Sequence, residues 1–185
     1  LQSNEIRKGK FILYNGEPTL ILDHSFTKTA RGGAVNRTKI KGLQSGVIKQ
    51  ITFGSSEKAE EVEVINKNIQ YLYADEDTGY FMDPESFEQY QVQIENIPGE
   101  TKFLKEGEKY QGAFYEDKIM SIMLPKKISL EVTKAPEGVK GDSANNPQKK
   151  ITVSTGYELQ APLFVNEGDV VIINTDTGEY DGRES

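Results

Sequence analysis

The sequence lacks cysteine and tryptophan, and it contains a single histidine, His24. Without cysteine the chain forms no disulfide and makes no use of an oxidising compartment. One histidine and no cysteine also leave almost no ligands for a zinc site. No apolar run approaches the roughly 18 residues that a membrane-spanning helix needs. These absences, together with the lack of a basic and then apolar leader at the start, predict a cytoplasmic protein with no membrane partner.

The residues that support catalysis are equally scarce. Asp23-His24-Ser25 do not form a catalytic triad, because neighbouring residues on a strand point to opposite faces. The acidic run Asp75–Asp77 lacks the spacing of an EF-hand and is better interpreted as a solvated turn. Gly32-Gly33 do not match the phosphate-binding loop, which needs Gly, four residues and then Gly-Lys-Ser/Thr. We therefore predict that the chain is not an enzyme and uses no metal or cofactor.

Charge is distributed unevenly along the chain, whose formal net charge is −7. Residues 1–63 carry +3, residues 64–125 carry −7 and residues 126–185 carry −3. A basic end on an acidic body suggests that one end approaches phosphate while the body avoids indiscriminate adhesion to polyanions. Segment charges of this size also arise by chance, so charge alone does not establish a nucleic-acid partner.

Turn signals about every eight to twelve residues predict short β-strands throughout and little helix. The expected fold class is therefore all-β, with three small barrels or sandwiches over residues 1–63, 64–125 and 126–185. The acidic stretch 54–64 is interpreted as a linker or domain edge. Strand and loop lengths in the third unit fit a five-stranded oligonucleotide-binding (OB) barrel.

The first unit contains a basic hairpin. One strand is expected to end near Phe26 and the next to begin near Ala34, which places KTARGGAV (residues 28–35) at the hairpin tip. Functional residues often lie at such tips, and each cation that neutralises a phosphate adds salt-dependent affinity. A solvated basic hairpin without a partner is an equally acceptable interpretation of this stretch alone. The cations concerned are Lys28, Arg31, Arg37, Lys39 and Lys41, of which the last three alternate on one face.

The C-terminal sequence TGYELQAPLFVNEGDVVIINTDTGEYDGR resembles the signature that ends members of the bacterial elongation factor P family. Three internal stretches resemble parts of the same family: FTKTARGGAVNRTKIKGLQSG, QYLYADEDTGYFMDPESFEQ and PEGVKGDSA. The resemblance covers nearly the whole chain. The signature positions in the tail are Gly156, Pro162–Val165, Gly168-Asp169, Asn174-Thr175, Gly178–Tyr180 and Arg183.

The resemblance implies an N-terminal SH3-like (KOW-type) barrel and two OB barrels, arranged as an L-shaped mimic of tRNA. It also implies a monomeric translation factor that binds the 70S ribosome between the peptidyl and exit sites. Such factors promote peptide-bond formation at polyproline stalls by positioning the peptidyl-tRNA. A general RNA-binding OB-barrel protein, such as an RNA chaperone that does not enter the ribosome, is the alternative from another class.

Carried over by position, Arg31 falls where most relatives have a lysine that is often lengthened by modification. The family tip typically reads Lys-Pro-Gly-Lys-Gly, whereas this chain has Lys28-Thr29-Ala30-Arg31-Gly32. Some branches rhamnosylate a tip arginine, which would make a modifying enzyme a partner. A paralogous branch has a Ser-Ala-Arg-Gly tip, and an unmodified arginine keeps its charge and its planar fork for phosphate. The resemblance implies tRNA or ribosome contacts for Lys28, Arg31, Gly32 and Lys39.

Two further contacts are implied for the third unit. The loop GVKGDSA resembles the family loop that faces exit-site mRNA, with Gly141, Asp142 and Ser143 here, where the serine retains a hydroxyl for hydrogen bonding. Tyr180 and Arg183 match residues that contact the peptidyl-tRNA, since a ring stacks on bases and a guanidinium binds phosphate. Without the resemblance, Tyr180 would be interpreted as a barrel side chain and Arg183 as a solvated terminus.

Overall fold

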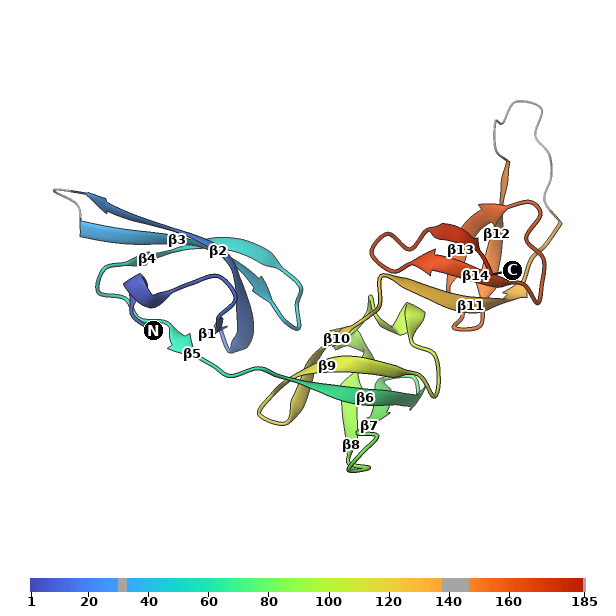
Figure 1. Cartoon of the computed structure of the whole chain (residues 1–185), viewed down its shortest axis with the longest axis horizontal. Helices are drawn as coiled ribbons and strands as arrows, with labels where there is room; N and C mark the ends of the chain where they lie inside the picture. Colours follow the sequence, from blue (N-terminus) through green and yellow to red (C-terminus); the bar gives the residue numbers. More distant parts are fainter. Residues whose placement is uncertain (30–32, 138–146, 185) are drawn as a thin grey trace.

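The computed structural model describes residues 1–29, 33–137 and 147–184. Within these residues the regular structure consists of β-strands and three single 3-10 turns, so the all-β prediction is confirmed. The strands form three antiparallel sheets of five strands each, which follow one another along a bent chain (Figure 1). Among the described residues, no helix is long and apolar enough to cross a membrane.

The first sheet has the strand order β4-β3-β2-β1-β5. Asn15-Gly16 connects the first two strands with φ angles of 52° and 82°, the left-handed conformation that a type I′ hairpin turn requires. The basic hairpin is formed by the next pair, whose strands are longer than expected and run to Thr29 and from Gly33. The strands are β1 (Phe11–Tyr14), β2 (Glu17–Thr29), β3 (Gly33–Gly42), β4 (Ile48–Gly54) and β5 (Glu60–Glu61).

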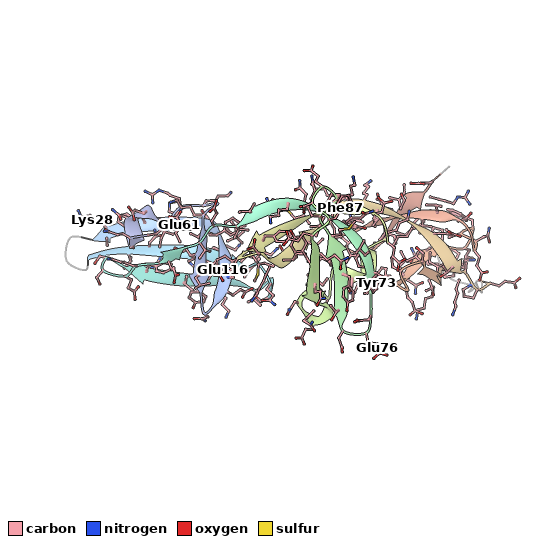
Figure 2. The ribbon with its side chains drawn as sticks, turned by 90° about the horizontal axis from the view of Figure 1, so that it is seen from below. Lys28, Glu61, Tyr73, Glu76, Phe87 and Glu116 are labelled. Carbon is pink, nitrogen blue, oxygen red and sulfur yellow. The ribbon has the colours of Figure 1, made fainter. Side chains whose placement is uncertain are left out.

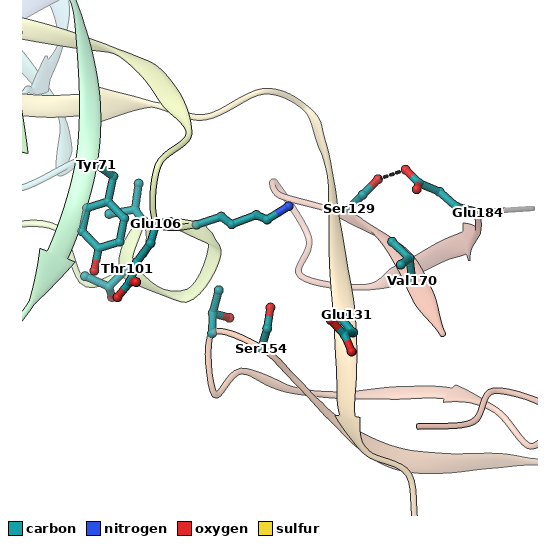
Figure 3. Close-up of a pocket in the computed structure, with 11 residues that line it drawn as sticks. Tyr71, Thr101, Glu106, Ser129, Glu131, Ser154, Val170 and Glu184 are labelled. Carbon is teal, nitrogen blue, oxygen red and sulfur yellow. Dashed lines mark hydrogen bonds between the residues drawn. The ribbon is translucent and has the colours of Figure 1, made fainter. Parts of the chain in front are cut away.

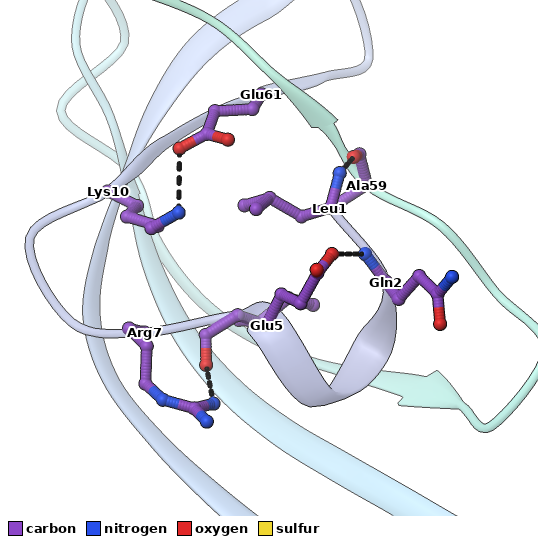
Figure 4. A network of polar contacts seen from close by, with 8 residues as sticks. Leu1, Gln2, Glu5, Arg7, Lys10, Ala59 and Glu61 are labelled. Atoms are coloured by element: carbon purple, nitrogen blue, oxygen red, sulfur yellow. Dashed lines mark hydrogen bonds and ion pairs between the residues drawn. The ribbon is translucent and has the colours of Figure 1, made fainter.

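The acidic stretch that was expected to be a linker is partly structured. β5 lies within it and pairs with β1, and Ala59 just before β5 is buried. The amino group of Leu1 donates a hydrogen bond to the Ala59 carbonyl (2.6 Å), and Lys10 Nζ pairs with Glu61 Oε1 at 2.9 Å (Figure 4). Residues 54–64 were expected to be a linker or a domain edge, and the structure shows that β5 forms the edge strand of the first sheet within this stretch.

A buried polar chain connects the base of the basic hairpin to the 3-10 turn η1 (Ser3–Glu5). Asn36 and Thr38 are fully buried in β3. Asn36 donates from Nδ2 to the Ser3 carbonyl (2.7 Å), and Thr38 donates from Oγ1 to Asn36 Oδ1 (3.2 Å). Because buried polar groups are stable only with partners, these bonds fix the hairpin on the body of the first sheet.

The second and third sheets share one topology. In each, the first strand is central, the second and third lie on one side, and the fourth and fifth lie on the other. The two edge strands of each sheet also contact one another, which closes a small barrel of the OB type. The strands are β6 (Ile65–Ala74), β7 (Thr78–Met82), β8 (Gln89–Gln93), β9 (Lys109–Tyr115) and β10 (Lys118–Met123), then β11 (Lys127–Lys134), β12 (Gln148–Val153), β13 (Glu158–Pro162), β14 (Val170–Asn174) and β15 (Tyr180–Arg183). Between β8 and β9 lie the turns η2 (Ile94–Asn96) and η3 (Thr101–Phe103).

Each sheet has its own apolar core, but the second and third cores are joined by one aromatic contact. Phe103 belongs to η3 of the second unit, yet its side chain is 4% exposed and packs in the core of the third. Its ring meets Tyr157 edge-on with centroids 5.2 Å apart, and Thr155 Oγ1 donates to the Lys102 carbonyl at 2.6 Å. The predicted boundary at residues 125–126 therefore divides the sequence at a place where the packing is continuous.

We predict that Phe103→Ala lowers the free energy of unfolding by about 3–5 kcal/mol, because it leaves a cavity in a buried core. Chemical denaturation followed by circular dichroism measures this loss. Amide hydrogen exchange should locate the weakened protection in β11–β15, although the substitution lies in the second unit. Phe87→Ala is the matched control, since Phe87 is 69% exposed and its loss should change stability by no more than about 0.5 kcal/mol. Weakened protection confined to β6–β10 would contradict the proposed role of this contact.

Candidate nucleic-acid interface

The basic hairpin carries a row of exposed cations on one face of β3. Arg37, Lys39 and Lys41 are exposed and alternate with buried Asn36, Thr38 and Ile40. The antiparallel register pairs Arg37 with Ser25 and Lys39 with Asp23, so these positions share the outer face. The predicted alternation of the three cations is confirmed. Its physical cause is the two-residue period of a strand whose other face covers a core.

Lys28 lies on the opposite face of the same hairpin. Its cross-strand partner is Ala34, which is two positions from Asn36 and therefore on the face of Asn36. Lys28 and the half-exposed Phe26 are accessible because the hairpin extends beyond the body of the sheet (Figures 1 and 2). The structure therefore places the predicted contacts Lys28 and Lys39 on opposite faces, so that the hairpin presents cations to both sides. Which face each lysine occupies depends on the strand register of the hairpin, which the structure provides.

Several predicted contacts lie outside the described residues. Arg31 and Gly32 belong to the segment 30–32 between β2 and β3, and Gly141, Asp142 and Ser143 belong to the segment 138–146 between β11 and β12. Their roles stay predictions.

Tyr180 and Arg183 are brought to one face of β15 by a β-bulge. Ile173 pairs with Tyr180, Ile172 with Gly182 and Val171 with Arg183, so Asp181 has no partner of its own in the ladder. In a regular strand, residues three positions apart point to opposite faces. The unpaired Asp181 shifts the rest of the strand by one position, so the side chains of Tyr180 and Arg183 lie on the same face. Nothing in the sequence analysis anticipated this bulge.

Arg183 is held by two neighbours in the third barrel. Its Nη1 lies 3.2 Å from Asp169 Oδ2, and its Cζ lies 5.5 Å from the centroid of the Phe164 ring. Tyr180 is half-buried and packs against the core of the third sheet. Arg183 is exposed, as its interpretation as a solvated terminus expects, and its guanidinium also makes an ion pair and a cation–π contact.

Models of protein families match nearly the whole chain. The KOW-like domain of elongation factor P matches residues 2–59, its OB domain residues 64–122 and its C-terminal domain residues 128–183. A curated elongation factor P from Borrelia hermsii is 37% identical over 186 residues, which cover 99% of this chain and 97% of that protein. The chain belongs to the elongation factor P family.

Two solved structures of other translation factors resemble the chain. The translation initiation factor eIF-5A family protein from Naegleria fowleri has a TM-score of 0.51 at 14% identity, and the alignment covers 67% of this chain and 96% of that one. The initiation factor 5A from Methanococcus jannaschii has a TM-score of 0.47 at 22% identity, covering 66% and 94% of the two chains. At 14% identity, the likeness to the Naegleria fowleri protein shows a shared fold and nothing further.

Membership of the elongation factor P family makes the chain a non-catalytic translation factor, as predicted. His24 lies in β2 next to Asp23. Asp23 Oδ1 accepts a hydrogen bond from the backbone N–H of His24 (2.9 Å), and the buried His24 Nδ1 has no partner among the described residues.

The acidic run of the second barrel is a capped turn, as predicted. Asp75 Oδ1 accepts hydrogen bonds from the backbone N–H groups of Asp77 (3.0 Å) and Thr78 (2.7 Å). The Tyr80 hydroxyl donates to Asp75 Oδ2 (2.9 Å), and the Tyr80 ring stacks on the exposed Tyr73. The bond from Thr78, followed by that from Tyr80, lowers the pKa of Asp75 below its ordinary value. Among the described residues, no cluster of acidic or histidine side chains could hold a metal ion.

A cleft of about 740 Å³ lies between the second and third barrels (Figure 3). Glu106 lines it from the second barrel, and Glu131 and Glu184 line it from the third. Ser129 Oγ donates a hydrogen bond to Glu184 at its rim. Three carboxylates around one lysine, Lys105, make this cleft repulsive to phosphate, so an RNA partner is expected on other surfaces.

We predict that the Asp169 carboxyl titrates below the ordinary aspartate range. The N–H of Asn166 is the main cause of the lowered pKa, and Arg183 contributes less. Because the folded pKa is depressed, the stability that this group contributes is present above its unfolded pKa and is lost as the pH falls through the folded pKa. In an NMR titration of side-chain carboxyls, Arg183→Leu should raise the Asp169 pKa only part of the way to normal. A full return to the ordinary value would contradict the dominance of the Asn166 bond.

Proposed function

We propose that this chain binds the ribosome between the peptidyl and exit sites and promotes peptide-bond formation at runs of proline. The observation that carries this proposal is the family match over all three units, combined with exposed cations on a hairpin at one end of the bent chain. The hairpin approaches the aminoacyl end of the peptidyl-tRNA, while the third barrel, at the far end of the chain, lies along the body of the same tRNA. The bent three-barrel shape serves as a mimic of tRNA.

Physical chemistry explains why proline needs such a factor. The pyrrolidine ring fixes φ, and its constrained nitrogen is a poor nucleophile. A badly placed peptidyl-prolyl end therefore wastes attempts at attack. Holding that end in an attack-ready geometry removes an entropic part of the barrier without any chemical group from the factor. The ribosome supplies the chemistry and the factor supplies position. An acidic body suits this task, because it repels RNA everywhere except at the cationic contacts.

The proposal names its partners. They are the 70S ribosome and the peptidyl-tRNA in the cytoplasm, with exit-site mRNA at residues 141–143, and the chain acts as a monomer. A modifying enzyme joins this set if Arg31 carries a sugar. Intact-mass measurement of the protein from its native host, followed by analysis of the peptide that contains residue 31, distinguishes a glycosylated from an unmodified arginine.

We predict that Arg31→Ala abolishes the relief of stalling and leaves the fold unchanged. The strand pairs of the hairpin are formed by residues up to Thr29 in β2 and from Gly33 in β3. The measurement is the rate of synthesis of a reporter with consecutive prolines in a reconstituted translation reaction. Lys49→Ala is the matched control, since Lys49 is an exposed cation on edge strand β4 of the same unit.

Full relief of stalling by the Arg31→Ala protein would refute the role of the tip. The alternative function, general RNA binding, makes a different prediction for the wild-type chain. It requires salt-sensitive binding to naked RNA together with no association with ribosomes. Relief of a polyproline stall by the wild-type protein excludes that alternative.

A further inference from the structure

An exposed aromatic ring and a guanidinium lie side by side on the third barrel. Phe164 is 58% exposed, although it is a large apolar side chain in a unit whose other large apolar side chains are mostly buried. The Arg183 guanidinium lies over this ring, with Cζ 5.5 Å from the centroid. A ring that is kept in solvent next to an arginine offers a surface for stacking.

The backbone beneath Phe164 is well fixed. The next residue, Val165, is fully buried in the third core, and its N–H donates to the Pro162 carbonyl (3.1 Å). The Asn166 side chain donates from Nδ2 to the Phe164 carbonyl (3.1 Å). Phe164 is therefore presented to solvent by an ordered segment and is not exposed through fraying.

Asp169 orients the arginine. Its Oδ2 accepts one hydrogen bond from the Asn166 N–H (2.8 Å) and one from Arg183 Nη1 (3.2 Å). The first bond fixes the carboxylate on the loop that also carries Phe164, so the carboxylate can in turn fix the guanidinium. An arginine has five N–H donors, and the bond to Asp169 uses only one of them. Most of the donors of Arg183 therefore remain available to a second anion.

Two cations act on the Asp169 carboxylate. Arg183 forms a hydrogen bond to it, and Lys149 lies close enough to contribute slightly to its lowered pKa. The other carboxylate of the loop, Glu167, accepts a hydrogen bond from the Ala135 N–H (3.3 Å). An exposed ring and a guanidinium with free donors thus lie together in a unit whose formal charge is −3. This combination matches the phosphate and the base of an unpaired or splayed nucleotide.

We propose that Phe164 extends the peptidyl-tRNA contact that the family resemblance implies for Arg183 by stacking on one nucleotide, and that Asp169 is the positioning residue of this contact. The base or ribose stacks on the Phe164–Arg183 pair, and the free N–H donors of Arg183 bind the phosphate. This inference rests on the proposed function, which brings the tRNA to the third barrel. It adds Phe164 and Asp169 to the residues on which recognition depends.

The test of the stacking contact compares ribosomes that carry peptidyl-tRNA with vacant ribosomes. Phe164→Leu keeps an apolar side chain but removes the ring, and it should weaken binding to the tRNA-carrying ribosomes about five- to tenfold. Phe164→Tyr keeps the ring and should bind like the wild-type chain. Phe87→Leu removes the other most exposed phenylalanine, on the second barrel, and should leave binding unchanged.

The test of the positioning role uses Asp169→Asn. The amide oxygen still accepts the Asn166 N–H, so the loop is retained, but the charge that orients Arg183 is lost. Binding to tRNA-carrying ribosomes should weaken about threefold, and the slope of log affinity against log salt should become shallower, because the phosphate contact is lost. Asp75→Asn is the matched control, since Asp75 caps a turn in the same way and faces no arginine. Circular dichroism of each variant verifies that the fold is intact.

Each outcome decides the inference. Wild-type affinity of Phe164→Leu overturns the stacking contact, and unchanged or tighter binding of Asp169→Asn overturns the positioning role. An equal loss on vacant ribosomes also overturns the inference, because the partner is then ribosomal RNA or protein. The same proteins are assayed for relief of proline stalls. If the wild-type chain gives no relief but Phe164 still governs binding to tRNA-carrying ribosomes, the proposed function fails and this contact stands.

Discussion

The small size of each sheet is the constraint on which the rest of the structure depends. A five-stranded barrel of this length is filled by its own side chains, here one compact cluster of buried residues for each sheet. Among the described residues these cores are made of packed side chains, so the candidate contacts lie on the outside of the barrels. They lie on the long β2–β3 hairpin and on the edge strand β15 of the third barrel. The three small barrels together present these contacts over an extended surface.

Contacts spread over several barrels can engage one partner together only if the barrels keep their spacing. Between the second and third barrels, Phe103 holds the two units together, because its ring packs in the core of the third barrel while its backbone belongs to η3 of the second. The hydrogen bonds Thr155 Oγ1 to Lys102 O and Thr175 Oγ1 to Pro125 O, each 2.6 Å, reinforce the contact. The first and second barrels are connected differently, through the short segment that follows β5. The packing and hydrogen bonds described above therefore hold the second barrel to the third, whereas the first barrel is joined by a connecting segment.

The sequence predicted what depends on short-range chemistry. The regularly spaced turn signals identified short strands throughout, and the alternation of Arg37, Lys39 and Lys41 identified an outer face. What it missed depends on long-range register. The bulge at Asp181, the pairing of β5 with β1 and the burial of Phe103 in a neighbouring core each require a partner strand that is distant in sequence. The contact between Arg183 and Asp169 was missed for the same reason, because the bulge alone brings the arginine to that face.

The charges at the two ends of the molecule are organised in opposite ways. On the hairpin, Lys28 and Lys39 occupy opposite faces and neither makes an ion pair among the described residues, so the hairpin is suited to insertion between negatively charged surfaces. On the third barrel, Lys127 pairs with Asp181 and Arg183 with Asp169, so its cations are held in place by acidic neighbours. Unpaired cations on a projecting hairpin adapt to irregular phosphate positions, whereas an oriented arginine selects one geometry. In the proposed function, the hairpin end thus supplies electrostatic attraction, and the third barrel fixes the position of the factor along the tRNA.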